Sequence, residues 1–362
     1  MDLDLILEPN LTPDAIMELG LLAEHHNFRG IWTQNYSSAR DAFMSLVPLA
    51  RASQRIRVGA VIVCPYEMHP MKIVNATLSL NEYAHGRGMV VIGSGGEWPE
   101  VMRSRVFHSS YGDRRTNIRE ALQISKRALT ERNISYEGKA YSALRFSTEW
   151  HNETPPLIYH GACGPKMIET GAGLADGIMM SDVMPAMLAK RLPALNRARE
   201  AAHAGASAIK AAGIAPGCAV NETAGQQAKF RISNFVAWHV RDDRERSYAE
   251  ARRELIIRGW LDRDWLEPYL SKTETETILN NRWPFLKAWI ERHGDIAGVP
   301  AHVTAKLVES LSLAGDLSDI DRHIERLRKF REAGFTEIAL RIHEDPAESI
   351  ELIASRVLPA LR

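Results

Sequence analysis

The chain has 362 residues, and its 45 lysine and arginine residues balance 45 aspartate and glutamate residues, so the formal net charge is zero. A nucleic-acid partner requires a basic excess that neutralises phosphates, and this balance therefore argues against one. Hydrophobic residues make up 45% and charged residues 25% of the chain, a composition typical of globular proteins that excludes wholesale disorder.

Short apolar runs alternate with longer stretches of helical periodicity along the chain. The apolar runs predict strands at residues 3–7, 30–33, 55–63, 88–93, 157–160, 177–180 and 337–342. Helical spacing and capping residues predict helices at 12–26, 41–52, 70–84, 114–131, from 165 onwards, 318–333 and 347–361. Strictly alternating strands and helices are typical of a parallel sheet with right-handed crossovers.

Two architectures fit this alternation, a closed (β/α)8 barrel and an open doubly wound sheet. The first strand begins at residue 3 and the last helix ends at residue 361, which favours closure. The segment 186–314 is longer than one β/α unit requires, and we expect one or two barrel units there plus a helical insertion. We therefore predict a single α/β domain over residues 1–362, a (β/α)8 TIM barrel with an insertion in its C-terminal half.

The sequence predicts a cytoplasmic protein. No secretory leader is apparent at the start, and no window approaches the ~20 consecutive apolar residues of a membrane-spanning helix, so we expect no membrane association. The three cysteines, Cys64, Cys163 and Cys218, are too few and too scattered for a disulfide framework or a zinc site, and we expect no metal.

Candidate functional residues follow the predicted strands, because a parallel barrel carries its chemistry at the carboxyl ends of its strands. Two of these loops are rich in glycine and precede a helix, an arrangement that lets a backbone approach a phosphate closely. Neither contains a dinucleotide fingerprint or a Walker A motif, so neither identifies the ligand alone. The residues at these strand ends are Asn35 and Tyr36, then Cys64, then Gly93, Ser94, Gly95, Gly96 and Glu97, and finally Ala162, Cys163 and Gly164.

Taken in order, four stretches resemble the luciferase-like flavin and deazaflavin oxidoreductases, and in particular their methylenetetrahydromethanopterin reductase-like branch. They are LGLLAEHHNFRGIWTQNY, IRVGAVIVCPYEMHP with LSLNEYAHGRGMVVIGSGG, PPLIYHGACGPKMIETGAGLADGIMM, and REAGFTEIALRI with VLPALR. The resemblance covers most of residues 1–185 and returns over about 315–362.

The resemblance implies an eightfold barrel that holds a flavin-like ring at its strand ends, with a bulge and a non-prolyl cis peptide near Val61–Ile62. It assigns backbone contacts with the ring to Val61, Ile62 and Cys64, and loop contacts to Gly93, Ser94, Gly95 and Gly96. It assigns contacts with the cofactor phosphate to Ala162, Cys163 and Gly164.

The chain departs from the family pattern where acid–base groups are expected. Deazaflavin enzymes of this family usually carry Asp-His after the second strand, and Asn35 and Tyr36 stand there. Tyr36 is a candidate proton donor, since its ordinary pKa near ~10 suits an acid or an orienting group. Glu97 stands one place later than the acidic residue of part of the family, and we expect it to be the carboxylate of proton transfer. The structural alternative is that Glu97 merely stands in the first turn of a helix, a position that suits its negative charge.

The resemblance implies hydride transfer between a deazaflavin, coenzyme F420, and a small organic substrate. One alternative is an FMN-dependent luciferase-like monooxygenase. Another is a barrel that binds a flavin without catalysis, which the loss of the Asp-His pair keeps open, and a third is an α/β protein without a redox ligand. The family also implies a homodimer.

Overall fold

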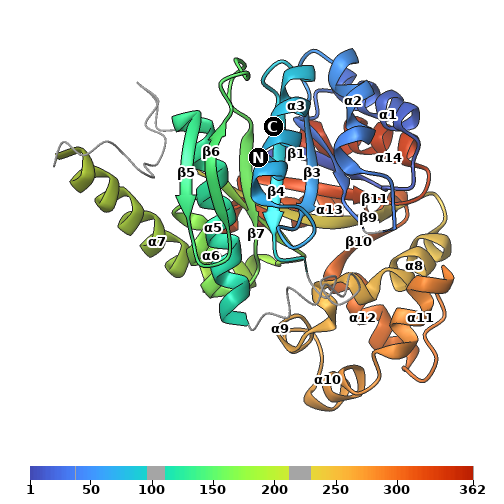
Figure 1. The fold of residues 1–362 in the computed structure, drawn as a ribbon. Coiled ribbons are helices and arrows are strands. Elements are labelled where there is room, and N and C mark those ends of the chain that lie inside the picture. The colour runs from blue at the N-terminus through green and yellow to red at the C-terminus, as the bar shows by residue number, and fades with distance from the viewer. Residues whose placement is uncertain (37, 96–110, 212–229, 362) are drawn as a thin grey trace. The chain divides into compact units, whose positions relative to one another are not determined.

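The structure is a computed structural model, and it describes the chain apart from residues 37, 96–110, 212–229 and 362 (Figure 1). The strands are β1 (Asp2–Leu7), β2 (Gly30–Gln34), β3 (Arg57–Val63), β4 (Gly88–Gly93), β5 (Asn133–Glu137), β6 (Ser142–Ser147), β7 (Leu157–Gly161), β8 (Gly177–Ser181), β9 (Arg231–Val240), β10 (Ser312–Gly315) and β11 (Glu337–Ile342).

The α-helices are α1 (Pro13–His25), α2 (Ala42–Ala52), α3 (Pro70–Tyr83), α5 (Tyr111–Glu131), α6 (Pro165–Ala172), α7 (Pro185–Ala211), α8 (Arg244–Arg253), α9 (Arg263–Leu266), α10 (Lys272–Leu279), α11 (Trp283–Glu291), α12 (Ala301–Leu311), α13 (Ile320–Ala333), α14 (Pro346–Leu352) and α15 (Leu358–Leu361). The 3-10 helices are η2 (Leu255–Ile257), η3 (Gly259–Leu261) and η4 (Leu317–Asp319), and η5 (Ile353–Val357) is a π-helix.

The main sheet has the strand order β10-β9-β11-β1-β2-β3-β4-β7-β8, and β8 also pairs with β9. Eight strands therefore close into a ring, and β10 is an additional strand beside β9. The pairings β2–β3, β3–β4, β4–β7 and β7–β8 are all parallel. The fold is a (β/α)8 barrel, which confirms the fold class predicted from the sequence.

The strand that completes the ring, β9, lies inside the segment for which the sequence predicts no particular strand. Its residues Arg231–Val240 include Ser233, Asn234 and His239, whose side chains are fully buried. These polar residues break the apolar run by which the other strands are recognised. Helices α8 to α12 follow β9 and precede β10, so the expected helical insertion lies between Arg244 and Leu311.

The chain divides into two compact units. The N-terminal unit contains Leu7–Met180 and Ala189–Ser233. Its helix α1 begins at Pro13 because Thr12 caps it, with the Thr12 hydroxyl accepting a hydrogen bond of 3.2 Å from the backbone N–H of Ala15. The antiparallel β5–β6 hairpin, which the sequence analysis does not predict, follows α5 and precedes β7.

The C-terminal unit contains Met1–Ile6, Ser181–Leu188 and Asn234–Arg362. Strand β1 runs parallel to β11, and β10 runs parallel to β9. The guanidinium group of Arg258 pairs with Asp182 at 2.9 Å, and both side chains are fully buried. Helix α13 ends at Gly334, whose φ of 111° lies in the left-handed region that glycine adopts without steric cost.

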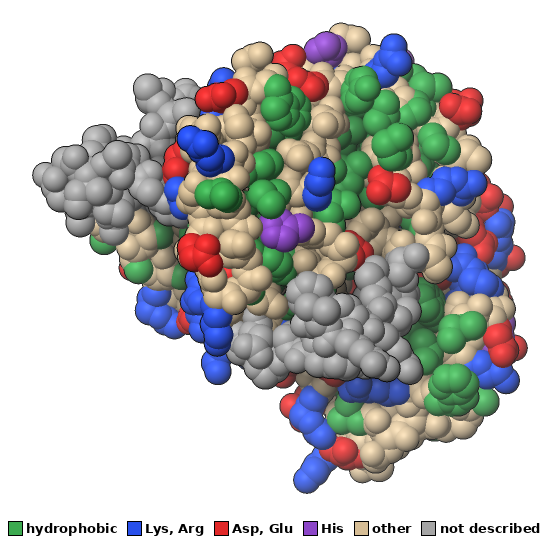
Figure 2. All heavy atoms as spheres, in the orientation of Figure 1, with side chains coloured by type: hydrophobic (Ala, Val, Ile, Leu, Met, Phe, Trp, Pro, Cys, Tyr) green, Lys and Arg blue, Asp and Glu red, His purple; other side chains and the backbone are tan. Residues whose placement is uncertain are grey.

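Acidic and basic side chains are interspersed on the face drawn in Figure 2, as the equal counts of the two charges suggest. A search of the described residues found no helix with the length and hydropathy needed to cross a membrane. Among the described residues, no cluster of three histidine, cysteine or acidic side chains is arranged to hold a metal ion.

Candidate cofactor site in the N-terminal unit

A bulge interrupts strand β3 near its carboxyl end. The register between β3 and β4 shifts between Ala60 and Val63, and the Val61–Ile62 peptide bond is cis. This confirms the bulge and the cis peptide expected from the family resemblance. The backbone oxygen of Val61 accepts a hydrogen bond of 2.9 Å from the backbone N–H of Asn35, which joins the bulge to the end of β2.

The glycines at the end of β4 lie against this bulge. A Cβ atom at Gly93 would stand 2.7 Å from Cγ2 of Ile62, so only glycine fits there without a shift. The Cys64 thiol contacts the backbone oxygen of Ser94, with 3.6 Å between Sγ and O. Gly95 has a φ of 61°, a conformation that side chains disfavour. The structure thus brings the residues predicted after β3 and β4 together; Gly96 and Glu97 lie outside the described residues.

The loop from β7 into α6 has the features of an anion site. Gly164 is the N-terminal cap of α6 and supplies no capping side chain, and a Cβ atom there would meet nothing within 4 Å. The first N–H groups of a helix point out from its N-terminus and attract negative charge. The N–H of Ala162 donates to the oxygen of Met179 at 3.1 Å, so a phosphate contact at Ala162 would not use this amide.

Arg191 of α7 supports the same loop. Its Nε donates a hydrogen bond of 2.7 Å to the backbone oxygen of Cys163, and the arginine is 6% exposed. A cation therefore stands beside the uncapped N-terminus of α6. The sequence analysis misses Arg191, because it lies 28 residues beyond Cys163 in the chain and in no recognisable motif.

The end of β2 carries the predicted polar pair Asn35 and Tyr36, and both are half-buried. The side-chain Nδ2 of Asn35 donates a hydrogen bond to Oε1 of Glu67, and the same oxygen accepts the backbone N–H of Cys64 at 3.0 Å. Burial raises the pKa of Glu67, and the nearby charge of Asp41 adds to this, although both hydrogen bonds lower it. Glu67 is thus a carboxylate of raised pKa within the site, and the sequence analysis gives it no role.

Three comparisons with known proteins bear on these features. A family model described as "Luciferase-like monooxygenase" matches residues 5–337.

The chain belongs to the luciferase-like monooxygenase family.

Among curated relatives of this luciferase-like chain is a 5,10-methylenetetrahydromethanopterin reductase of Archaeoglobus fulgidus, 25% identical over 349 residues that cover 94% of each protein. Among solved structures, the coenzyme F420-dependent tetrahydromethanopterin reductase of Methanopyrus kandleri aligns over the full length of both chains, with a TM-score of 0.75 and 19% identity. An F420-dependent secondary alcohol dehydrogenase, crystallised with an F420-acetone adduct, also aligns over both full lengths, with a TM-score of 0.69 and 16% identity. These matches confirm the resemblance inferred from the sequence.

His69 has a structural role in this luciferase-like barrel. It caps α3, where its Nδ1 accepts a hydrogen bond of 3.3 Å from the backbone N–H of Met71. Its ring also packs edge-to-face on Tyr141, and the Tyr141 hydroxyl donates to the backbone oxygen of Pro65 at 2.9 Å. These contacts fix the segment that follows Cys64.

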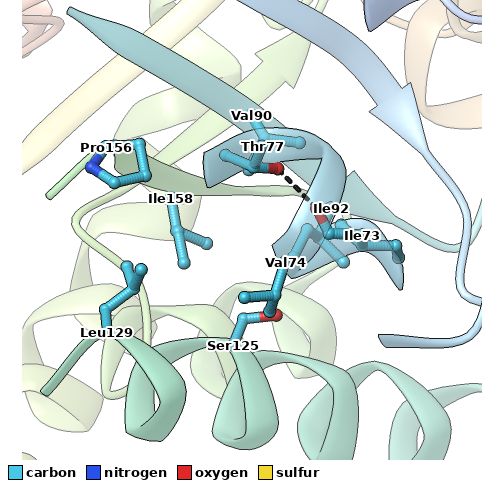
Figure 3. Close-up of a pocket in the computed structure, with 9 residues that line it drawn as sticks. All are labelled: Ile73, Val74, Thr77, Val90, Ile92, Ser125, Leu129, Pro156 and Ile158. Atoms are coloured by element: carbon cyan, nitrogen blue, oxygen red, sulfur yellow. Dashed lines mark hydrogen bonds between the residues drawn. The ribbon is translucent and has the colours of Figure 1, made fainter. Parts of the chain in front are cut away.

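A separate cavity in this unit is drawn in Figure 3, where apolar side chains of α3, α5, β4 and the start of β7 face one another. Its volume is about 10 Å³, no more than a single water molecule requires and far too small for a small-molecule ligand. The Thr77 hydroxyl beside it donates to the backbone oxygen of Ile73 at 2.7 Å. The cavity is therefore a packing gap, and none of the predicted site residues lines it.

Proposed function

We propose that the protein is an oxidoreductase that binds coenzyme F420 and transfers a hydride between the deazaflavin ring and a small organic substrate. The observation that carries the proposal is the meeting of the β3 bulge at Val61 and Ile62 and the glycine-rich end of β4. The proposal is also supported by the relative from Archaeoglobus fulgidus, which is named a reductase and aligns with 94% of this chain.

The described residues fit the phosphate of such a cofactor. Gly164 leaves open the space that a side chain would fill, and the N-terminus of α6 lacks a capping side chain. Arg191 adds a positive charge beside Cys163. We assign the phosphate contacts to Ala162, Cys163 and Gly164, with Ala162 contributing a group other than its N–H.

The described residues also fit a flat ring. Val61, Ile62 and Cys64 form one wall, and Gly93, Ser94 and Gly95 form the adjoining one with almost no side-chain bulk. Cys64 is 9% exposed and Val61 4% exposed, so this wall is largely dry. The bound deazaflavin supplies the hydride chemistry, while the protein orients both reactants and excludes water.

We assign the handling of the substrate proton to the polar groups at the rim. Tyr36 carries a phenol that donates a proton or a hydrogen bond, and Asn35 orients the substrate through its amide. We also retain Glu97 as the carboxylate of proton transfer on the strength of its place in the sequence. An FMN-dependent monooxygenase is the second candidate function, which the description of the matching family favours.

We further propose a cytoplasmic homodimer that acts on a small-molecule substrate. Light scattering on the purified protein measures its mass directly. A mass equal to that of one chain would rule out the homodimer.

The activity is tested by mixing the purified protein and oxidised F420 with candidate alcohols, sugar phosphates and reduced pterins. The proposal predicts loss of the visible absorbance of F420 with at least one substrate class. Binding of F420 without turnover by any class would support the non-catalytic barrel. Turnover that requires FMN, a reductase and O₂ would support the monooxygenase.

A further inference from the structure

We propose that Glu67 is a positioning residue that holds the side-chain amide of Asn35 with its Nδ2 group turned toward Glu67, so that Asn35 offers its carbonyl oxygen to a substrate. The site then favours a molecule that carries an O–H or N–H group beside the reacting carbon. This inference rests on the proposed function, because it assigns a chemical class to the substrate of that same site.

The position of the Glu67 carboxylate follows from the turn after β3. The backbone N–H groups of Glu67 and Met68 both donate to the oxygen of Cys64, at 3.1 and 3.2 Å. This turn folds the chain back, and Oε1 of Glu67 accepts the backbone N–H of Cys64 at 3.0 Å. The carboxylate is therefore anchored to the backbone before it contacts Asn35.

The partner of Asn35 determines which way its amide faces. A backbone N–H only donates, so Oε1 of Glu67 must present a lone pair to Cys64 whether the carboxyl group is ionised or protonated elsewhere. Only the NH₂ group of Asn35 forms a hydrogen bond with that same oxygen. The orientation of the Asn35 amide is thus fixed as long as Oε1 of Glu67 carries no proton.

The backbone of Asn35 is fixed as well. Its N–H donates to the oxygen of Val61 at 2.9 Å, which ties Asn35 to the β3 bulge. The backbone of Asn35 is fixed and its NH₂ group is engaged. Because no hydrogen bond to its Oδ1 is found among the described residues, this carbonyl oxygen is the acceptor offered to another molecule. One neutral hydrogen bond then favours a donor-bearing ligand over a donor-free one by roughly three- to tenfold.

Nuclear magnetic resonance of the protein without cofactor tests the positioning role directly. The hydrogen-exchange rate of the Asn35 side-chain amide should be slow in the wild type and in Glu67→Gln, whose amide oxygen still accepts both hydrogen bonds. It should rise roughly three- to tenfold in Glu67→Ala. Should the alanine variant not fold, Glu67→Asp, one methylene shorter, should show the same rise.

A matched control is Glu24→Ala. The carboxylate of Glu24 accepts hydrogen bonds from the backbone N–H groups of Gln54, Arg55 and Ile56, just before β3. Like that of Glu67, it therefore anchors a backbone segment. This variant should leave the exchange of the Asn35 amide unchanged. Equal exchange rates in the wild type, Glu67→Ala and Glu67→Asp would overturn the positioning role.

The substrate class is tested with protein loaded with oxidised F420 and two probes that have no hydride to transfer, 2-methylpropan-2-ol, which has an O–H donor, and acetone, which has none. Wild type and Glu67→Gln should bind 2-methylpropan-2-ol roughly three- to tenfold more tightly than acetone. The ratio should approach one in Glu67→Ala. A preference for acetone, an unaltered ratio in Glu67→Ala, or no binding of either probe would overturn the assigned class. Failure of the proposed function would instead appear earlier, as failure to load F420.

Discussion

Arg191 and Cys163 are joined by a hydrogen bond of 2.7 Å from the guanidinium Nε to the backbone oxygen, although they lie 28 residues apart. The contact fastens α7 to the loop that leads into α6. Because Arg191 is almost fully buried, losing it leaves a carbonyl group without its donor and removes a positive charge from the loop.

The first prediction concerns this arginine. Arg191→Gln should weaken F420 binding by about tenfold, because a charge-assisted hydrogen bond contributes about 1.5–3 kcal/mol and part of it acts through the loop. A fluorescence titration of F420 measures the effect. Lys190→Gln is the control, since Lys190 is exposed and loses the same charge. Equal affinities of the two variants would remove Arg191 from the cofactor site.

The second prediction uses the open space at Gly164. Its φ of −81° suits any residue, and a Cβ atom there meets nothing within 4 Å, so Gly164→Ala and Gly164→Val should fold with stability near that of wild type. The added methyl groups would occupy the space assigned to the phosphate. Affinity for F420 should therefore fall in order from glycine to alanine to valine, and titrations of the three proteins in parallel would show whether it does.

The third prediction concerns the two described cysteines. Burial raises the pKa of Cys64 to about 12, so only about one thiol in a thousand is ionised at pH 9. Since the thiolate is the nucleophile, iodoacetamide should leave Cys64 largely unmodified at this pH. Cys163 is half-buried and should react, and F420 should protect it. Mass spectrometry of the digested protein reads both sites, and rapid alkylation of Cys64 would contradict its buried setting.

The fourth prediction concerns pH and Glu67. Burial raises the pKa of Glu67 in the folded protein above the ordinary value of 4.5, so the folded state binds more protons than the unfolded state between the two values. The free energy of unfolding should therefore fall as pH rises through that window. Glu67→Gln lacks this titration and should become more stable relative to wild type over the same range.

Urea denaturation of both proteins between pH 4 and pH 8 measures this difference. If the wild type gained stability relative to Glu67→Gln as pH rises, the carboxylate would be better stabilised in the folded protein than in the unfolded chain.

The barrel was predictable from the sequence because seven of its eight ring strands are apolar runs. The exception is β9, whose apolar run is interrupted by buried polar side chains. Asn234, for example, exchanges two hydrogen bonds of 3.1 Å with the backbone of Val183. No local pattern reveals such a pairing, since the partner strand end lies about fifty residues earlier.

The parts of the candidate site that are defined by backbone shape were predictable from the sequence. Contacts between side chains from different segments of the chain were harder to predict. The cis peptide at Val61–Ile62 and the glycines of β4 follow from the family resemblance. The contact between Asn35 and Glu67 joins residues 32 positions apart, on segments that only the parallel pairing of β2 and β3 brings together. Glu97 remains a sequence prediction, because it lies outside the described residues.

We propose that the β3 bulge, the β4 glycines and the N-terminus of α6 together form a deazaflavin site. Equilibrium titration of the purified protein with oxidised F420 and, separately, with FMN is the decisive measurement. Binding of F420 should be saturable and at least tenfold tighter than binding of FMN, and Gly164→Val should weaken it. Tighter binding of FMN, or no binding of F420, would show that these elements do not form such a site.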